Sequence, residues 1–182
     1  WLLPLDKKTS MHNVTYTLRD ALYTASTLIT FYKHSRSVGM ANLAQLVNVL
    51  PLIKTNENKA FATAIFFPFV LFRQMQPYLL HTQCSCETFD SKGISINMSA
   101  HEKVPFLDEL ATISEDGRCL SVVLVNRFPI NQMKVHIRLE NAAGVVKNAL
   151  RITAASPSSF NDSTHPNRVH ISDLTSIQKE SD

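Results

Sequence analysis

The sequence predicts two segments: an α/β segment over residues 1–80, then an all-β segment, an antiparallel β-sandwich, over residues 81–182. Before residue 80, apolar residues recur at three- and four-residue steps, the period of an amphipathic helix. After residue 80 they alternate with polar residues in short runs between turns, as in strands with one solvated face. With 182 residues, of which 45% are hydrophobic and 18% charged, the chain can bury a core of this kind.

The clearest helix is expected over residues 17–34. Thr17 can cap its first turn, with Asp20 three residues further on in a variant of the capping box. Lys33 and His34 lie at the other end, where the helix dipole favours cations. We interpret His34 as a helix-end cation only.

A strand is predicted to begin near Val38 and to enter a polar pocket, because the apolar run 38–53 contains three amide side chains. Buried amides cost free energy unless they are hydrogen-bonded, whereas a sugar ligand offers many hydroxyl partners. The order of helix, strand and polar turn is that of a (β/α) unit, in which binding groups gather where the strand ends. The three amides are Asn42, Gln45 and Asn48.

A second, shorter helix is predicted over residues 68–76, since Pro68 fits a first helical turn and Pro77 ends the helix. The longest apolar stretch, residues 60–72, is shorter than the roughly 20 residues that a membrane-spanning helix needs. It therefore belongs in a core.

The strands expected in the second segment share a period of two residues and are separated by turns about every ten residues. Turn residues occur at 115–117 and 141–144. The expected strands cover residues 94–98, 111–113, 120–125, 133–140 and 145–152.

Charge and cysteine content exclude several classes of protein. The net charge of +3 is spread along the chain without a basic and aromatic cluster, so no nucleic-acid partner is expected. The three cysteines are too few for a disulfide scaffold, and the disulfide state of Cys84, Cys86 and Cys119 stays open. His81 with Cys84 and Cys86 lacks a fourth zinc ligand, so neither a metal nor a cofactor is expected.

Three sequons make Asn13, Asn97 and Asn161 candidate N-glycosylation sites. They favour secretion, but no signal peptide is visible and the compartment stays open.

Several segments, in the right order, resemble the α-L-arabinofuranosidases of glycoside hydrolase family 51. The most specific is the run Met40-Ala41-Asn42-Leu43-Ala44-Gln45-Leu46-Val47-Asn48-Val49. The others are residues 16–22, 33–38, 104–108, 124–127 and 165–169. The resemblance implies that residues 1–80 are the incomplete C-terminal part of a (β/α)₈ catalytic barrel and that residues 81–182 are the C-terminal β-sandwich, whose last strand is expected to be missing.

The implied activity is removal of terminal non-reducing α-L-arabinofuranosyl residues from arabinan, arabinoxylan or derived oligosaccharides, with retention of configuration. Retaining glycosidases use two carboxyl groups about 5 to 5.5 Å apart. In this family both are glutamates on earlier barrel strands, and residues 1–80 contain only Asp6, Asp20 and Glu57. Asp108 and Glu109 are neighbours on an expected strand and should point to opposite faces. We therefore expect no catalytic residue in this chain, which should be inactive alone.

The resemblance assigns Gln45 to the end of the last barrel strand, where it would hydrogen-bond the arabinose, and Trp1 is a second candidate, stacking on a sugar ring. The alternative interpretation of Gln45 is an amide that holds a backbone loop; Asn42 and Asn48 are predicted to be structural. The expected partner is an arabinose-containing oligo- or polysaccharide, and no membrane partner is expected. Whether the full-length protein forms a homo-oligomer is left open. The alternative function is a non-catalytic β-sandwich module that binds carbohydrate or another protein.

Overall fold

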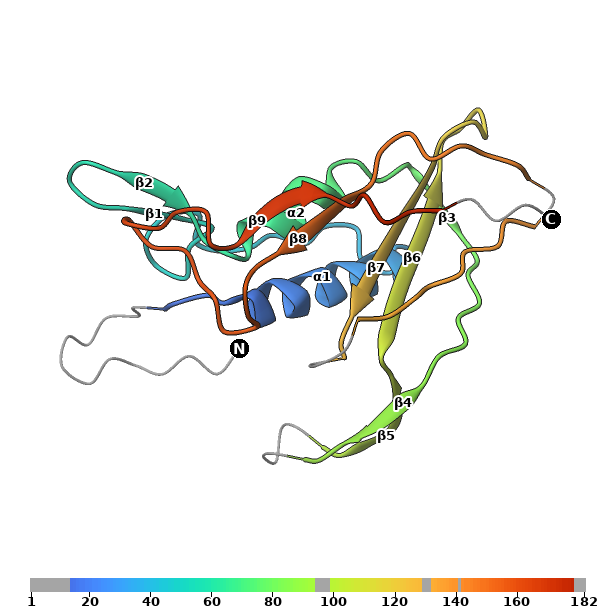
Figure 1. Ribbon diagram of the computed structural model, residues 1–182, viewed down its shortest axis with the longest axis horizontal. Coiled ribbons are helices and arrows are strands. Elements are labelled where there is room, and N and C mark those ends of the chain that lie inside the picture. Colours follow the sequence, from blue (N-terminus) through green and yellow to red (C-terminus); the bar gives the residue numbers. More distant parts are fainter. Residues whose placement is uncertain (1–13, 94–98, 129–131, 141, 179–182) are drawn as a thin grey trace. The chain divides into compact units, whose positions relative to one another are not determined.

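The computed structural model describes residues 14–93, 99–128, 132–140 and 142–178 (Figure 1). The chain divides into two compact units, each assembled from segments distant in sequence. Unit 1 comprises Trp1–Thr24, Asn42–Arg73 and Val135–Asp182, and unit 2 comprises Ala25–Ala41 and Gln74–Lys134. The division into a barrel part and a sandwich at residue 80 stays a prediction.

The predicted helix at residues 17–34 is confirmed as α1 (Leu18–Lys33). The carboxylate of Asp20 accepts hydrogen bonds from the backbone N–H of Thr17 at 2.7 Å and from its hydroxyl at 2.8 Å. This aspartate thus closes the first turn in the manner of a capping box, as its spacing predicts. The buried stripe of the helix follows four-residue steps and consists of Ala21, Ala25 and Ile29.

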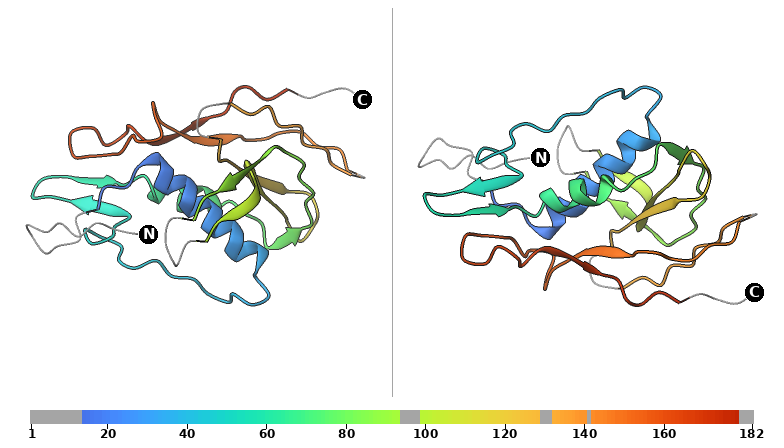
Figure 2. Two further views of the ribbon diagram at one scale, coloured as in Figure 1. Left: turned by 90° about the horizontal axis from the view of Figure 1, so that it is seen from below. Right: turned by 90° about the horizontal axis from the view of Figure 1, so that it is seen from above.

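Unit 1 contains two short antiparallel strand pairs and one short helix. β1 (Ile53–Thr55) pairs with β2 (Ala60–Ala62), and β8 (Leu150–Thr153) pairs with β9 (His170–Asp173). Figure 2 shows β8 and β9 side by side from two further directions. The core of unit 1 joins side chains from the first, middle and last parts of the chain, namely Val14, Tyr16, Ala21, Ala64, Ile65 and Val169.

The short helix of unit 1, α2 (Phe66–Phe72), is earlier and shorter than the predicted helix over residues 68–76. Pro68 does lie in its first turn, as expected. The helix ends at Phe72, and the N–H of Gln76, at the predicted end, donates to the hydroxyl of Thr112 at 2.9 Å instead of to a helical carbonyl. No helix in the described part of the chain is long and apolar enough to cross a membrane.

Unit 2 contains a three-stranded antiparallel sheet in the order β3 (Tyr78–Leu80), β6 (Leu107–Ile113) and β7 (Leu120–Asn126). The predicted hairpin around residues 115–117 is confirmed by the β6–β7 pairing. Gly117 has φ +69°, a conformation that residues with a Cβ rarely adopt. The hydroxyl of Ser114 donates to Asp116 at 2.6 Å and lowers the pKa of that carboxyl group.

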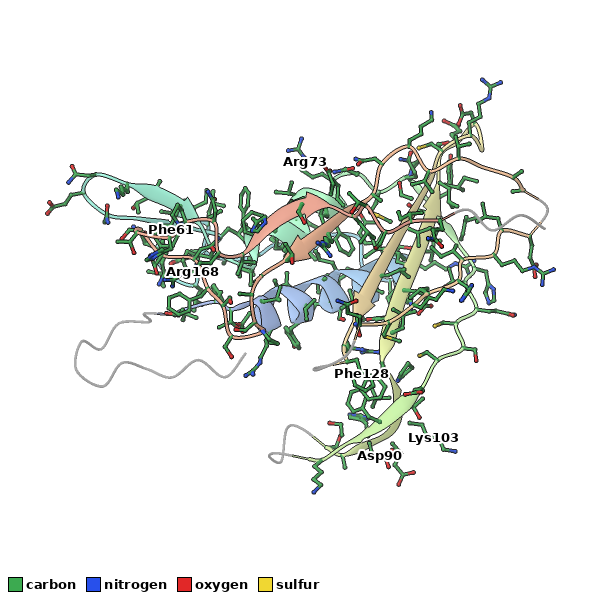
Figure 3. The ribbon with its side chains drawn as sticks, in the orientation of Figure 1. Phe61, Arg73, Asp90, Lys103, Phe128 and Arg168 are labelled. Atoms are coloured by element: carbon green, nitrogen blue, oxygen red, sulfur yellow. The ribbon has the colours of Figure 1, made fainter. Side chains whose placement is uncertain are left out.

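A second antiparallel pair in unit 2 joins β4 (Thr88–Ser91) to β5 (His101–Pro105). Beside it, the ring of Phe106 lies 4.7 Å from that of Phe89 and 4.3 Å from that of Phe128. Figure 3 labels Phe128, which belongs to this cluster. The backbone of Arg127 donates to the carbonyl of Phe106 at 2.7 Å, so two of the segments used for the family resemblance are in contact.

The strand predicted to begin near Val38 is wrong: in the described residues no strand precedes β1. Residues 40–49 form an exposed loop, in which Met40 is 80% and Leu46 58% exposed. The only strand-like pairing of the run is an isolated bridge between Val47 and Ile53. A parallel barrel strand needs a neighbour on each side, and the described residues supply none here.

The strand predicted over residues 133–140 is also wrong, since this segment is irregular in the described residues and Ile137 is 58% exposed. Of the strand predicted over residues 145–152, only the end is formed, as the beginning of β8; Val145 is 78% exposed. Alternation marks a segment that can bury one face, but a strand forms only where a partner strand satisfies its backbone. The strand predicted over residues 94–98 lies outside the described residues.

Candidate functional site

Gln45 lies in the loop before β1 and its side chain is exposed, so the segment is not the buried strand that the sequence suggested. The peptide bond between Ala44 and Gln45 is cis. That Gln45 binds arabinose stays a prediction. Trp1, the second candidate, lies outside the described residues.

Asn48 fixes this loop to β1. Its Oδ1 accepts the backbone N–H of Thr55 at 2.8 Å, and its Nδ2 donates to the hydroxyl of Thr55 at 2.9 Å. Asn48 has φ +65°, a left-handed conformation that asparagine tolerates better than most residues. The structural role predicted for Asn48 is confirmed, whereas the exposed Asn42 shows no such role.

Asp108 and Glu109, neighbours on β6, both reach the same ammonium group. Lys33 Nζ lies 3.5 Å from Asp108 Oδ1 and 3.2 Å from Glu109 Oε1. The hydroxyl of Thr82 also donates to Glu109 at 2.9 Å. This ion-paired cluster ties the end of α1 to β6 and suits a structural role better than glycosidase chemistry.

Cys84 and Cys86 carry free thiols close to this cluster. Burial, followed by the neighbouring Cys86, raises the pKa of Cys84, so its thiol resists ionisation. His81 is exposed nearby in sequence. Across the described ranges, no group of three histidine, cysteine, aspartate or glutamate side chains is arranged to hold a metal ion.

Asn161 is a buried structural residue of the loop between β8 and β9, only 6% exposed. Its Nδ2 donates to the carbonyls of Ala62 at 3.1 Å and Val169 at 2.9 Å, and its Oδ1 accepts the N–H of Val169 at 2.7 Å. A glycan on Nδ2 would have to displace the hydrogen bonds to Ala62 and Val169. Glycosylation at Asn161 stays a prediction, and Asn13 and Asn97 lie outside the described residues.

Asp162, the next residue, organises the same loop, and sequence reasoning missed it. Its Oδ1 accepts the hydroxyl of Thr164 at 2.6 Å and the backbone N–H groups of Thr164 and His165 at 2.8 and 2.7 Å. Its Oδ2 lies 3.2 Å from Arg168 Nη1. These donors, above all the Thr164 hydroxyl, lower the pKa of Asp162 well below its ordinary value. The pattern Asp-Ser-Thr, typical of an Asx turn, could have predicted this.

We expect Asp162→Asn to remove part of the acid sensitivity of the fold. A carboxyl group whose pKa is lower in the folded chain than in the unfolded chain stabilises the fold fully above the unfolded value, here 3.8, and loses that effect as the pH falls further. The free energy of unfolding of the wild type should therefore exceed that of Asp162→Asn by more at about pH 6 than at about pH 3. Urea unfolding at both pH values measures this; a difference that does not change with pH contradicts it.

Comparison with known proteins decides the family of the chain. Residues 4–182 match the α-L-arabinofuranosidase C-terminal domain. The chain belongs to this family. Among curated relatives, the probable α-L-arabinofuranosidase C of Aspergillus clavatus is 35% identical over 133 residues, which are 72% of this chain and 26% of that protein. The intracellular exo-α-(1→5)-L-arabinofuranosidase of Halalkalibacterium halodurans is 30% identical over 131 residues, 71% of this chain and 25% of that protein.

Solved structures of arabinofuranosidases have the same fold. The GH51 α-L-arabinofuranosidase of Thermotoga petrophila matches 89% of this chain and 34% of its own length, with a TM-score of 0.82 and 32% identity. The α-L-arabinofuranosidase of Thermotoga maritima, in its arabinose complex, matches 88% of this chain and 34% of its own, with a TM-score of 0.76 and 31% identity. The resemblance inferred from sequence is confirmed.

The antiparallel sheets of this arabinofuranosidase C-terminal domain match the C-terminal β-sandwich of the GH51 enzymes, which confirms the all-β prediction. The barrel units are not seen in the described residues. The chain spans 25% to 34% of the length of these relatives.

Proposed function

We propose that the chain is the C-terminal part of a retaining α-L-arabinofuranosidase, which removes terminal non-reducing α-L-arabinofuranosyl residues from arabinan, arabinoxylan or derived oligosaccharides. The observation that carries this proposal is the match of residues 4–182 to the C-terminal domain, together with relatives that are named arabinofuranosidases. In the proposal, residues 1–80 complete the catalytic barrel of the whole enzyme and residues 81–182 form its sandwich.

The catalytic carboxyl groups of the proposed enzyme belong to earlier barrel strands. Retention of configuration needs two carboxyl groups about 5 to 5.5 Å apart, one of which attacks the sugar while the other transfers protons. The adjacent carboxylates of Asp108 and Glu109 are bound to Lys33, an arrangement that favours a structural role. This chain would contribute substrate contacts and structural support.

Gln45 is the proposed substrate-binding residue. Its side chain is exposed in a loop whose end is anchored by the hydrogen bonds between Asn48 and Thr55. A glutamine amide both donates and accepts hydrogen bonds, which suits a sugar hydroxyl. An anchored loop also loses little conformational entropy when it binds.

The chain alone should not hydrolyse an aryl α-L-arabinofuranoside, because the proposal places both catalytic carboxyl groups outside it. Release of the aryl group at high protein concentration measures this directly. Turnover by the purified chain that Gln45→Ala abolishes would contradict the proposal; Asn42→Ala, an exposed amide in the same loop, is the matched control.

The second candidate function is a non-catalytic module that binds carbohydrate by itself. The ion-paired state of Asp108 and Glu109 is compatible with it, since a binding module needs no catalytic carboxylate pair. Calorimetry with arabino-oligosaccharides separates the two functions. Saturable binding by the chain alone supports the module, whereas an absence of binding supports the incomplete barrel.

A further inference from the structure

The loop between β8 and β9 in unit 1 lines an open hollow of about 430 Å³. Its volume lies within the range of about 300 to 1,000 Å³ that is common for small-molecule sites. Figure 3 shows Arg168 on this loop. The hollow is lined by Ala155, Ser156, Ser158, Ser159, Phe160 and Arg168.

The wall formed by the serines is held in place before any ligand binds. Ser156 N–H donates to the hydroxyl of Ser159 at 3.1 Å, and Ser159 N–H donates back to the carbonyl of Ser156 at 3.0 Å. The carbonyl of Ser159 also accepts the N–H of Leu18 at 2.9 Å, in the first turn of α1. A wall fixed in this way loses little entropy on binding.

Arg168 is positioned from three sides. Its Nη1 donates to Asp162 at 3.2 Å, its Nη2 lies 3.0 Å from His165 Nδ1, and its guanidinium carbon lies 5.9 Å from the centre of the Phe160 ring. A guanidinium group has five N–H donors, so these contacts leave donors for a ligand. Asp162 thus orients Arg168 but is not itself one of the residues that line the hollow.

The lining has a definite chemical preference. Its only charged side chain is that of Arg168, and the three serines add hydroxyl groups. A guanidinium fork suits a carboxylate, hydroxyls suit the hydroxyls of a sugar, and the Phe160 ring offers an apolar surface for sugar C–H groups. A carboxylated sugar combines these features. Arg168 already pairs with Asp162, so a ligand carboxylate would use the N–H donors that this pairing leaves, whereas a neutral sugar offers them only hydroxyl oxygens.

We propose that this hollow binds a uronic acid residue, with Arg168 holding the carboxylate and the serine hydroxyls contacting the ring hydroxyls. The site does not include Gln45, and its binding does not depend on hydrolytic activity. It would add recognition of carboxylated sugars to a protein whose relatives are named arabinofuranosidases.

Amide NMR titration of the chain with D-glucuronate tests the proposal, with D-glucose and acetate as the matched neutral and non-sugar probes. We expect saturable shifts at Ser158, Ser159 and Phe160, and at least tenfold weaker binding of both comparison probes. Equal binding of acetate, equal binding of glucose, or an absence of saturable shifts with glucuronate would overturn the proposal.

Two variants locate the site. Arg168→Gln should weaken glucuronate binding at least tenfold, whereas Arg151→Gln, an exposed arginine on β8 outside the hollow, should leave it unchanged. Ser158→Ala changes an exposed side chain and should keep the fold while weakening binding about threefold. If Arg168→Gln does not fold, Ser158→Ala decides: unchanged binding in that variant would overturn the proposal.

Discussion

Asn161→Ala should lower the free energy of unfolding by about 2 to 4 kcal/mol. The substitution removes both donors to the carbonyls of Ala62 and Val169, and the acceptor for the N–H of Val169. Val169 has no exposed surface, so water cannot replace these partners without opening the core. Each buried polar group left without a partner costs about 1 to 3 kcal/mol. Urea unfolding at neutral pH measures the change.

Asn148→Ala is the matched control, because Asn148 is an exposed asparagine shortly before β8. Its effect should stay within about 0.5 kcal/mol. Asn161→Asp keeps an acceptor for the N–H of Val169 but loses the amide donors, and it adds a charge in a buried place. We expect it to destabilise the fold too. If Asn161→Ala lowers the free energy of unfolding no more than Asn148→Ala does, the amide of Asn161 does not stabilise the fold through its hydrogen bonds to Ala62 and Val169.

Ile65→Ala should lower the free energy of unfolding by about 2 to 5 kcal/mol. Ile65 has no exposed surface and packs in the core of unit 1 with Ala64 and Val169. Shortening it removes buried apolar atoms and leaves a cavity that its neighbours fill only in part. Because small proteins have a total stability of about 5 to 15 kcal/mol, a loss of this size is easily seen in urea or thermal unfolding.

Val49→Ala serves as the control for Ile65→Ala, since Val49 is 42% exposed in the loop before β1. A side chain that already contacts water loses less transfer free energy when it is shortened. Its effect should remain below about 1 kcal/mol. Similar losses for the two variants would show that Ile65 is not part of the core as described.

The elements predicted correctly from the sequence are those that local chemistry determines. α1 follows from its apolar stripe and from Asp20, which lies three residues after the cap and bonds back to Thr17. The β6–β7 hairpin follows from a turn with Gly117 at positive φ between two apolar runs. In both cases every group that specifies the element lies within a few residues of it.

The predictions that failed depend on partners distant in sequence. The segments 38–49 and 133–140 have the composition of strands, but strand formation requires a neighbour that the local pattern does not reveal. The hydrogen bond of Asn161 to Ala62, which is 99 residues away, could not be predicted from the local pattern either. Lys33 likewise joins Asp108 across 75 residues, so strand alternation alone could not show that Asp108 and Glu109 share a cation.

The candidate sites also combine features that the local sequence predicts with features that depend on residues distant in the chain. The family resemblance drew attention to residues 165–169, but the hollow beside Arg168 also needs Ser156 and Ser159, whose placement comes from the first turn of α1. Gln45 is proposed from the resemblance, and its exposure agrees with a residue that meets a ligand. Amide content alone had suggested a buried strand, because composition does not distinguish a pocket wall from an exposed loop.

Activity of a chimera tests most directly whether this chain is the C-terminal part of an arabinofuranosidase. The matching C-terminal third of the Thermotoga petrophila enzyme, which shares the fold with a TM-score of 0.82, would be replaced by this chain. We expect the chimera to hydrolyse an aryl α-L-arabinofuranoside, the chain alone to show no turnover, and Gln45→Ala in the chimera to lower kcat/KM at least tenfold. A chimera that unfolds in one sharp thermal transition but shows no turnover, or whose kcat/KM is unchanged by Gln45→Ala, would contradict this assignment.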